Sequence, residues 1–370
     1  MCAQDGAATS TSDAVTLVIT TSPTPSAPSP DLIVDILGSF KLHCSVLLSC
    51  RVIVVFDTYD RIGECMRLKK GQITAEGAEA VELYKANVKD LILRTWYPGA
   101  DHASRVFVQG SSLAEYGSPH LAENHVTLST LQTDDGRVTF VEPAARLGFG
   151  LAVRSALRLT ETPYVWVQQH DWPLARDIPL GPLVEVMRNS EGDSKAPVKY
   201  VCLPAIRMLS YATSAHVVRF PALRALTAAL KRDFKAAPAS SQSQSQPDCD
   251  RDRGVGVGVG VSVPLTPLFF WHDKPHVAAT AHYLARVFPS RLAIARGDFI
   301  EDSIGQRART QMKEGNWAKW ACWLYYPGEG REVCLQHRHG RVWRGMAAEM
   351  QTRALFSEMK GKQNTPLPTP

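Results

Sequence analysis

The sequence predicts an α/β fold in which helices flank a mixed sheet whose first strands are parallel. Val15–Thr20 (VTLVIT) and Arg51–Phe56 (RVIVVF) are β-branched runs typical of buried strands. The mixed apolar stretch Asp31–Cys50 between them predicts a helix, with Asp31 as its N-cap. A strand, a proline-rich loop, a helix and a second strand form a βαβ unit, which places the two strands side by side and parallel.

The rest of the chain alternates between the same two kinds of element. Apolar residues at helical spacing predict helices over residues 75–93, Phe149–Leu157, Leu223–Phe234 and Val277–Phe288. Short apolar runs predict strands at Arg105–Val108, Val138–Val141, Tyr164–Gln168 and Tyr200–Leu203. This order favours one α/β domain.

A low-complexity insertion over residues 236–263 divides this domain into two parts, 15–235 and 264–350. Its Ser/Gln section predicts a surface insertion. Its Gly–Val alternation is not a phosphate-binding loop, because Pro264 and Pro267 follow it where such a loop needs a helix. Residues 1–14 and the tail 351–370 have the composition of disordered ends.

The composition excludes several classes of protein. Of the 370 residues 45% are hydrophobic and 21% charged, and the net charge of +5 is spread along the chain, so nothing indicates nucleic-acid binding. The eight cysteines form no CxxC pair, which argues against a structural zinc site and favours reduced thiols. Neither a signal-peptide pattern nor an uncharged apolar run of about 20 residues occurs. We therefore expect a cytoplasmic or cytosol-facing protein without a transmembrane segment.

Polar residues end two of the predicted strands. Thr21 opens the loop after the first strand, and Asp57 follows the second. Ligands of open α/β sheets lie beyond the carboxyl ends of the strands, where Asp57 can accept hydrogen bonds from a ribose or a base. The alternative is that Asp57 caps a turn.

Gln169, His170, Asp171 and Trp172 end the strand that begins at Tyr164. A hard divalent cation takes carboxylate oxygens together with substrate phosphates, so Asp171 is a candidate metal ligand. The alternative is that His170 and Asp171 are turn residues and Trp172 belongs to the core.

Two later segments carry further candidates. Glu301 and Asp302 can supply a general base toward an acceptor hydroxyl, although an acidic pair also suits a helix N-terminus. His337 and His339 alternate on an extended segment, so either can complete a metal shell while Arg338 and Arg341 meet phosphate. The alternative for this segment is a solvated basic stretch.

The motifs TPYVWVQQHDW (162–172) and DFIEDSIGQ (298–306) resemble the family 2-like glycosyltransferases of GT-A fold, especially eukaryotic and algal members. VTLVITTSPTPS, VIVVFD and RLGFGLAVRSAL precede them in the family's order, and the resemblance covers roughly residues 15–60 and 140–345. It implies a Rossmann-like nucleotide-diphospho-sugar transferase, an inverting enzyme assisted by Mn²⁺ or Mg²⁺. The sugar, of the hexosyl class, would pass from a nucleotide sugar to a hydroxyl of a carbohydrate, lipid or protein acceptor.

The resemblance also implies roles for individual residues. Asp57 would contact the nucleoside, and Asp171, with His170 beside it, stands where the family has its DxD metal motif. Asp302 or Glu301 would be the base, and His337 or His339 the late metal ligand. Arg146 and Arg154 precede the metal strand and would approach the diphosphate. Gln169 replaces the first acid of DxD, and its amide can hydrogen-bond a ribose hydroxyl instead.

Two other readings compete with an active transferase. A catalytically inactive GT-A-like protein that binds a nucleotide sugar or glycan is favoured by the missing first acid and opposed by the Glu301–Asp302 pair. A Rossmann methyltransferase or dehydrogenase is disfavoured because the loop TTSPTPS contains no glycine for close approach of a cofactor. Six aromatic residues are either sugar platforms or core: Trp172, Trp317, Trp320, Trp323, Tyr325 and Tyr326.

Overall fold

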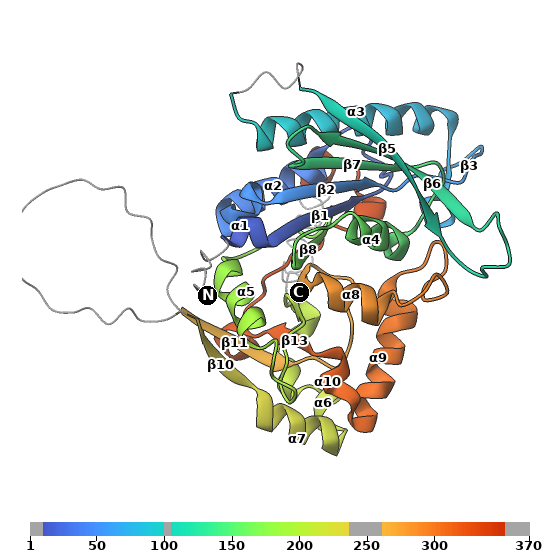
Figure 1. Cartoon of the computed structure of the whole chain (residues 1–370). Coiled ribbons are helices and arrows are strands. Elements are labelled where there is room, and N and C mark those ends of the chain that lie inside the picture. Colours follow the sequence, from blue (N-terminus) through green and yellow to red (C-terminus); the bar gives the residue numbers. More distant parts are fainter. Residues whose placement is uncertain (1–9, 100–104, 237–260, 352–370) are drawn as a thin grey trace, which may run out of the picture.

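The computed structural model describes residues 10–99, 105–236 and 261–351 and is built around one large mixed sheet (Figure 1). Its eleven strands follow the order β10-β11-β13-β9-β12-β8-β1-β2-β7-β6-β5. In chain order they are β1 (Val15–Thr21), β2 (Arg51–Phe56), β5 (Phe107–Glu115), β6 (His125–Thr133), β7 (Val138–Pro143), β8 (Tyr164–Gln169), β9 (Tyr200–Cys202), β10 (Arg232–Ala236), β11 (Val261–Pro267), β12 (His276–Ala279) and β13 (Cys322–Tyr325). A two-stranded ribbon, β3 (Arg61–Ile62) with β4 (Gln72–Ile73), lies apart from this sheet.

Helices pack on the sheet through their apolar faces (Figure 1). They are α1 (Thr11–Ala14), α2 (Asp31–His43), α3 (Ala75–Trp96), α4 (Phe149–Arg158), α5 (Leu180–Asn189), α6 (Ala215–Val218), α7 (Pro221–Leu230), α8 (Thr280–Val287), α9 (Gln306–Gln311) and α10 (Trp317–Trp320). Two π-helical turns, Glu301–Gly305 and Met312–Asn316, flank α9. The predicted α/β fold with a mixed sheet flanked by helices is therefore confirmed.

The order of the central strands places a switch point between β1 and β8. Strand β1 pairs in parallel with β2 on one side and with β8 on the other, and β2 pairs in parallel with β7. The chain runs from β1 through β2 to β7, and α4 then brings it back to β8 across β1. The carboxyl ends of β1, β2 and β8 consequently lie next to one another on the same side of the sheet. The change in strand order between β1 and β8 lies among them.

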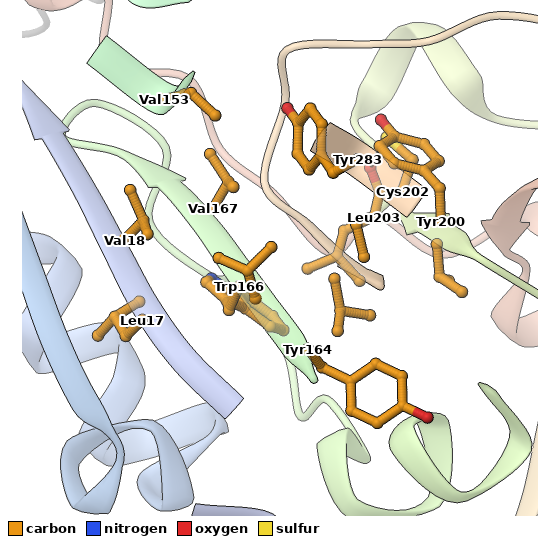
Figure 2. Packing of buried hydrophobic residues seen from close by; sticks show 14 of the residues in the cluster. Leu17, Val18, Val153, Tyr164, Trp166, Val167, Tyr200, Cys202, Leu203 and Tyr283 are labelled. Atoms are coloured by element: carbon orange, nitrogen blue, oxygen red, sulfur yellow. Dashed lines mark hydrogen bonds between the residues drawn. The ribbon is translucent and has the colours of Figure 1, made fainter. Parts of the chain in front are cut away.

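Burial explains why these central strands are continuous apolar runs. All seven residues of β1 are buried, because helices cover both faces of a parallel sheet. Figure 2 shows Val18 of β1 and Val167 of β8 near Val153 of α4, and all three side chains are fully buried. The sheet extends without a break into the later strands, since β12 pairs antiparallel with both β8 and β9. Strands from both predicted parts of the domain thus share one sheet.

Several expected boundaries differ from the structure. Helix α7 ends at Leu230, and Phe234, expected on this helix, lies on strand β10. Val277, expected at the start of a helix, lies on β12, and α8 begins only at Thr280. Helix α2 begins at Asp31 itself with Pro30 as its N-cap residue, so the prediction of Asp31 as N-cap was wrong.

The predicted disordered and low-complexity segments lie mostly outside the described residues. Of the expected N-terminal tail, Thr11–Ala14 forms the short helix α1. Of the insertion 236–263, the described residues Ala236 and Val261–Val263 belong to β10 and β11, and residues 237–260 lie outside the description, as do 352–370. Within the described ranges, no helix is both long and apolar enough to cross a membrane.

Candidate functional site

A cavity of about 410 Å³ opens where the carboxyl ends of β1, β2 and β8 meet. It is lined by Thr20–Pro23 at the end of β1, Asp57–Tyr59 after β2 and Gln169–Trp172 at the end of β8. Gly148, Phe149 and Ala152 bring the N-terminal turn of α4 to its wall, and residues 337 and 339–342 line another side. The volume lies in the range of pockets that hold small molecules, about 300–1,000 Å³.

Asp171 is a firmly held carboxylate in this cavity. Its Oδ2 contacts His337 Nε2 at 3.1 Å and accepts a hydrogen bond of 2.9 Å from the backbone N–H of Gly340. Burial opposes ionisation of Asp171, but these hydrogen bonds and the nearby His170 outweigh it and lower its pKa to about 2. Asp171 is therefore a buried anion in direct contact with the ring of His337.

Gly340 is the residue that permits this arrangement. A Cβ atom at position 340 would lie 2.7 Å from Nε2 of His170 and 3.2 Å from Oδ2 of Asp171. Only glycine lets the backbone of the late segment approach the β8 end so closely. The ring of His337 stacks on Trp172 at 4.2 Å and lies 4.1 Å from the ring of His339, so both late histidines face the cavity.

His170 is a buried member of the site. Its Nδ1 contacts Thr21 Oγ1 at 2.7 Å, and the same hydroxyl contacts the hydroxyl of Tyr84 on α3 at 2.5 Å. Burial lowers the pKa of His170 below its ordinary value. Thr21 and His170 thus bind each other across the ends of β1 and β8 and fix the spacing of the two strand ends.

Asp57 holds the backbone that leads into helix α4. Its Oδ1 accepts hydrogen bonds from the backbone N–H of Leu147 (2.7 Å) and Thr58 (3.0 Å), and its Oδ2 accepts one from Gly148 N–H (3.0 Å). Asp57 lines the cavity, yet these bonds match the turn-capping alternative that the sequence left open. By holding residues 147 and 148, it aims the N-terminal end of α4 at the cavity, where the helix dipole favours an anion.

Three basic side chains line the same cavity. Arg146 lies 4.0 Å from Asp60, Lys274 lies 3.9 Å from Glu301, and the guanidinium of Arg341 lies over the ring of Phe299 at 5.0 Å. Arg341 makes no ion pair with any described residue. Together with the α4 N-terminus these groups suit a ligand that carries phosphate.

Glu301 and Asp273, which both line the cavity, form an acidic pair. The backbone N–H of Asp273 lies 3.4 Å from Glu301 Oε2, and the N–H of Glu301 lies 3.3 Å from Asp273 Oδ2. The hydrogen bond from His272, with Lys274 nearby, lowers the pKa of Glu301 to about 2. Burial and the charge of Glu301 raise the pKa of Asp273 well above its ordinary value, and its Oδ1 is buried without a hydrogen-bond partner.

Most residues that the sequence singled out lie together in this cavity. The lining contains Thr21, Asp57, Arg146, Gln169, His170, Asp171, Glu301, His337 and His339. Gln169, which stands in place of an acid, donates a hydrogen bond from Nε2 to the carbonyl of Asp273 at 2.8 Å. Chain segments more than 300 residues apart are brought together here: Thr21, Asp57 and residues 169–171 lie at the ends of β1, β2 and β8, whereas Glu301, His337 and His339 reach them through tertiary packing.

Arg154 and Asp302 are the two predicted site residues that do not line the cavity. Arg154 is only 1% exposed on α4 and donates from Nη2 to the carbonyl of Glu115, so it points to the β5 end and not to a diphosphate. Burial lowers the pKa of Arg154 to about 10. Asp302 is exposed, because the π-helical turn that buries Ile304 turns position 302 outward. Arg338 likewise binds Asp35, at 2.7 Å.

The donor set around Asp171 is small for a metal site. Among the described residues no group of three or more His, Cys, Asp or Glu side chains is arranged to hold an ion. Asp171 and His337 are two such donors in contact, and no described residue hydrogen-bonds to Asp171 Oδ1. Asp171 supplies the single carboxylate that a cation of the magnesium type uses beside waters and substrate phosphate oxygens, so this donor set is not an all-protein cage.

The aromatic candidates divide clearly. Trp172 lines the cavity, whereas five others are at most 7% exposed and belong to the core: Trp317, Trp320, Trp323, Tyr325 and Tyr326. The sequence reasoning missed Asp273 and Lys274. A signal was available, since His272, Asp273 and Lys274 follow the apolar run Leu268–Trp271 much as His170 and Asp171 follow β8.

Comparison with known proteins gives only distant likeness. No protein-family model matches the chain, and no curated protein matches its sequence. Among solved structures it is similar to a mannosyltransferase from Pyrobaculum calidifontis in complex with GDP-Man and Mn²⁺. The TM-score is 0.36 and the identity 13%, over 86% of this chain and 58% of that one. This chain thus spans less than two thirds of the matched structure, and a likeness at this level assigns no role to the cavity.

Proposed function

We propose that this chain is a glycosyltransferase that moves a sugar from a nucleotide-diphosphate donor to an acceptor hydroxyl. The observation that carries the proposal is the position of the cavity. It lies beyond the carboxyl ends of β1, β2 and β8, at the switch point of the sheet, which is where open α/β sheets bind nucleotides. Phosphate-binding groups and carboxylates line it together, and a transfer reaction needs both.

The donor diphosphate would lie against the N-terminal end of α4. Gly148 and Phe149 line the cavity there, and Arg146 and Arg341 bring positive charge to the same space. Asp171 and His337 would hold a Mn²⁺ or Mg²⁺ ion, which when bound neutralises charge on a departing nucleoside diphosphate. Gln169 lines the cavity as well, and the oxygen of its amide would accept a hydrogen bond from a sugar or ribose hydroxyl.

Glu301 is the base that this arrangement favours over Asp302, because only Glu301 lines the cavity. As the acceptor oxygen attacks the anomeric carbon, its proton passes to Glu301 and the bond from that carbon to the diphosphate oxygen breaks. The products are the glycosylated acceptor and a nucleoside diphosphate. Attack from the face opposite the leaving group would invert the anomeric centre.

A pair of neighbouring substitutions tests this assignment. Glu301→Gln keeps the shape of the side chain but cannot take a proton, so we expect transfer or donor hydrolysis to fall by about 10²- to 10⁴-fold. Asp302→Asn is the matched control and should leave the rate within about twofold, the scatter of an exposed substitution. The readout is release of nucleoside diphosphate from UDP- and GDP-sugars. Equal losses in both variants, or loss in Asp302→Asn alone, would contradict the assignment.

A second candidate function is binding of a nucleotide sugar or glycan without catalysis. Two observations favour it: Gln169 replaces a carboxylate and uses its amide N–H on Asp273, and the low pKa of Glu301, about 2, makes it a weak base. This candidate predicts donor binding with no nucleoside diphosphate released, and with binding unchanged in Glu301→Gln. Release of nucleoside diphosphate by the wild type that is lost in Glu301→Gln would support the transferase.

A further inference from the structure

The outer edge of strand β5 lies far from the cavity in the strand order and has no partner among the described strands. β5 is the last strand of the sheet and pairs only with β6. Val106, Val108 and Leu113 are 65%, 58% and 47% exposed. Because side chains alternate between the two faces of a strand, Val108 and Leu113 lie on opposite faces. Both faces of β5 are therefore open to solvent along its middle.

The opposite edge of the same sheet is protected in a way that β5 is not. Strand β10 has five residues, and three of them, Arg232, Asp233 and Lys235, are charged and exposed. Short, charged edge strands prevent unwanted pairing between sheets. β5 has nine residues, FVQGSSLAE, with neither a charge nor a proline before Glu115. Such an edge is the type that adds a strand from another chain.

The register with β6 shows which backbone groups of β5 are free. The N–H of Asp134 donates to the carbonyl of Val106 (3.2 Å), and the N–H of Tyr116 donates to the carbonyl of Asn124 (3.0 Å). Since ladder bonds alternate along an antiparallel pair, even-numbered residues of β5 direct their backbone groups to β6. Phe107, Gln109, Ser111 and Leu113 direct theirs to the free edge.

We propose that β5 pairs antiparallel with β5 of a second copy of this chain, about a twofold axis at Gly110. In this register Phe107 faces the partner subunit's Leu113, and Gln109 faces the partner subunit's Ser111. The backbone N–H and C=O groups of these residues point outward in both copies, so they can hydrogen-bond to each other across the two strands. Gly110, on the axis, adds no side chain to the contact.

The charges at the two ends of β5 select the antiparallel orientation. Arg105 precedes the strand and Glu115 ends it. Antiparallel pairing about Gly110 places Arg105 opposite the partner subunit's Glu115, whereas parallel pairing would place like charges together. Within its own chain Arg105 lies 3.6 Å from Asp134 and Glu115 lies 2.8 Å from Arg158. Exposed pairs of this kind contribute little energy, so they orient the contact more than they stabilise it.

Solution mass tests the proposal on the full chain. Light scattering across roughly 1 to 200 µM, the range in which a micromolar contact forms, should show a rise from 40.7 kDa toward twice that mass. Ser111→Pro removes an outward N–H while leaving the β6 ladder intact, and should shift the chain to monomer. Ser111→Ala keeps that N–H and should stay dimeric. Leu113→Lys introduces a charge at the edge and should also be monomeric. If circular dichroism shows that Ser111→Pro does not fold, the mass of Leu113→Lys tests the proposal instead.

Two cysteine variants test the register itself. In the proposed pairing residue 110 of one copy lies beside residue 110 of the other, so Gly110→Cys should form a disulfide-linked dimer on mild oxidation. Ser112→Cys is the matched control, because its two copies would be about 13 Å apart along the strands. The unsubstituted chain gives the background. A chain that stays monomeric at all concentrations, a dimer that survives Ser111→Pro and Leu113→Lys, or equal cross-linking of both cysteine variants overturns the proposal.

Discussion

At the scale of single residues, the cavity is built from carboxylates in very different states. Asp171 is ionised and held by His337 and the Gly340 amide, while Asp57 is committed to three backbone N–H groups. Asp273 has a raised pKa and one oxygen without a partner. Environment separates residues of one type into a ligand candidate, a structural cap and a buried acid.

The raised pKa of Asp273 makes a prediction about stability and pH. A carboxyl whose pKa is higher in the folded than in the unfolded state stabilises the fold at acidic pH and loses that contribution as pH rises through its folded pKa. Asp273→Asn is neutral at every pH. We therefore expect it to raise the free energy of unfolding at pH 7.5 by on the order of 1 kcal/mol, the usual size of a single-residue effect.

Urea unfolding at pH 7.5 and pH 4.5 measures this difference. The advantage of Asp273→Asn should shrink toward pH 4.5, because the folded wild-type chain takes up a proton on Asp273 as the pH falls through the raised pKa of this carboxyl. Asp134→Asn, at an exposed carboxylate, is the control and should change little at either pH. An Asn variant that is less stable at pH 7.5, or a difference independent of pH, would show that Asp273 is ionised and satisfied in the folded chain.

At the scale of elements, burial decided which predictions succeeded. Strands β1, β2 and β8 are buried apart from Arg51 at the start of β2 and Gln169 at the end of β8, and their predicted bounds differ from the structure by one residue at most. Strand β6 was missed, although His125–Thr133 alternates exposed and buried positions at its start, with Val126 and Leu128 inward. Val277 misled the helix prediction because β12 runs directly into α8, and a strand of four residues is too short to show the two-residue period of a strand.

Helix α4 begins after Gly148, and the residues around Gly148 leave no room for a side chain. Gly148 has a φ of 80°, and a Cβ there would lie 2.4 Å from the Cα of Gly297. We expect Gly148→Ala to destabilise the fold by about 2 kcal/mol or more, since both the left-handed backbone and the contact oppose a side chain. It should also move the α4 N-terminus and weaken phosphate binding.

Gly38 on α2 provides the matched control. A Cβ at position 38 meets no atom within 4 Å, and the position lies inside a regular helix. Gly38→Ala should therefore stabilise the fold by about 0.5–1 kcal/mol, through helix propensity. Denaturant unfolding of the two variants measures both changes. The same sign for both would contradict the packing described at residues 148 and 297.

At the scale of the whole molecule, strand order explains how far the site could be predicted. Thr21, Asp57 and Asp171 follow strands that are parallel neighbours, so a βαβ pattern alone placed them at one edge. Residues 301 and 337 reach that edge through tertiary packing that no local pattern records. Asp302 and Arg154 were misplaced for the same reason, because the side of a turn or helix that faces the cavity depends on what packs beneath it.

The most direct test of the proposed donor site is calorimetric titration of UDP and GDP, with and without Mn²⁺. We expect one of the two to bind, more tightly with the metal, and the metal-dependent part to disappear in Asp171→Ala. Asp302→Ala, exposed and outside the cavity, should bind as the wild type does. No binding of either nucleotide, or binding that is unchanged in Asp171→Ala, would contradict a donor site at the carboxyl ends of β1, β2 and β8.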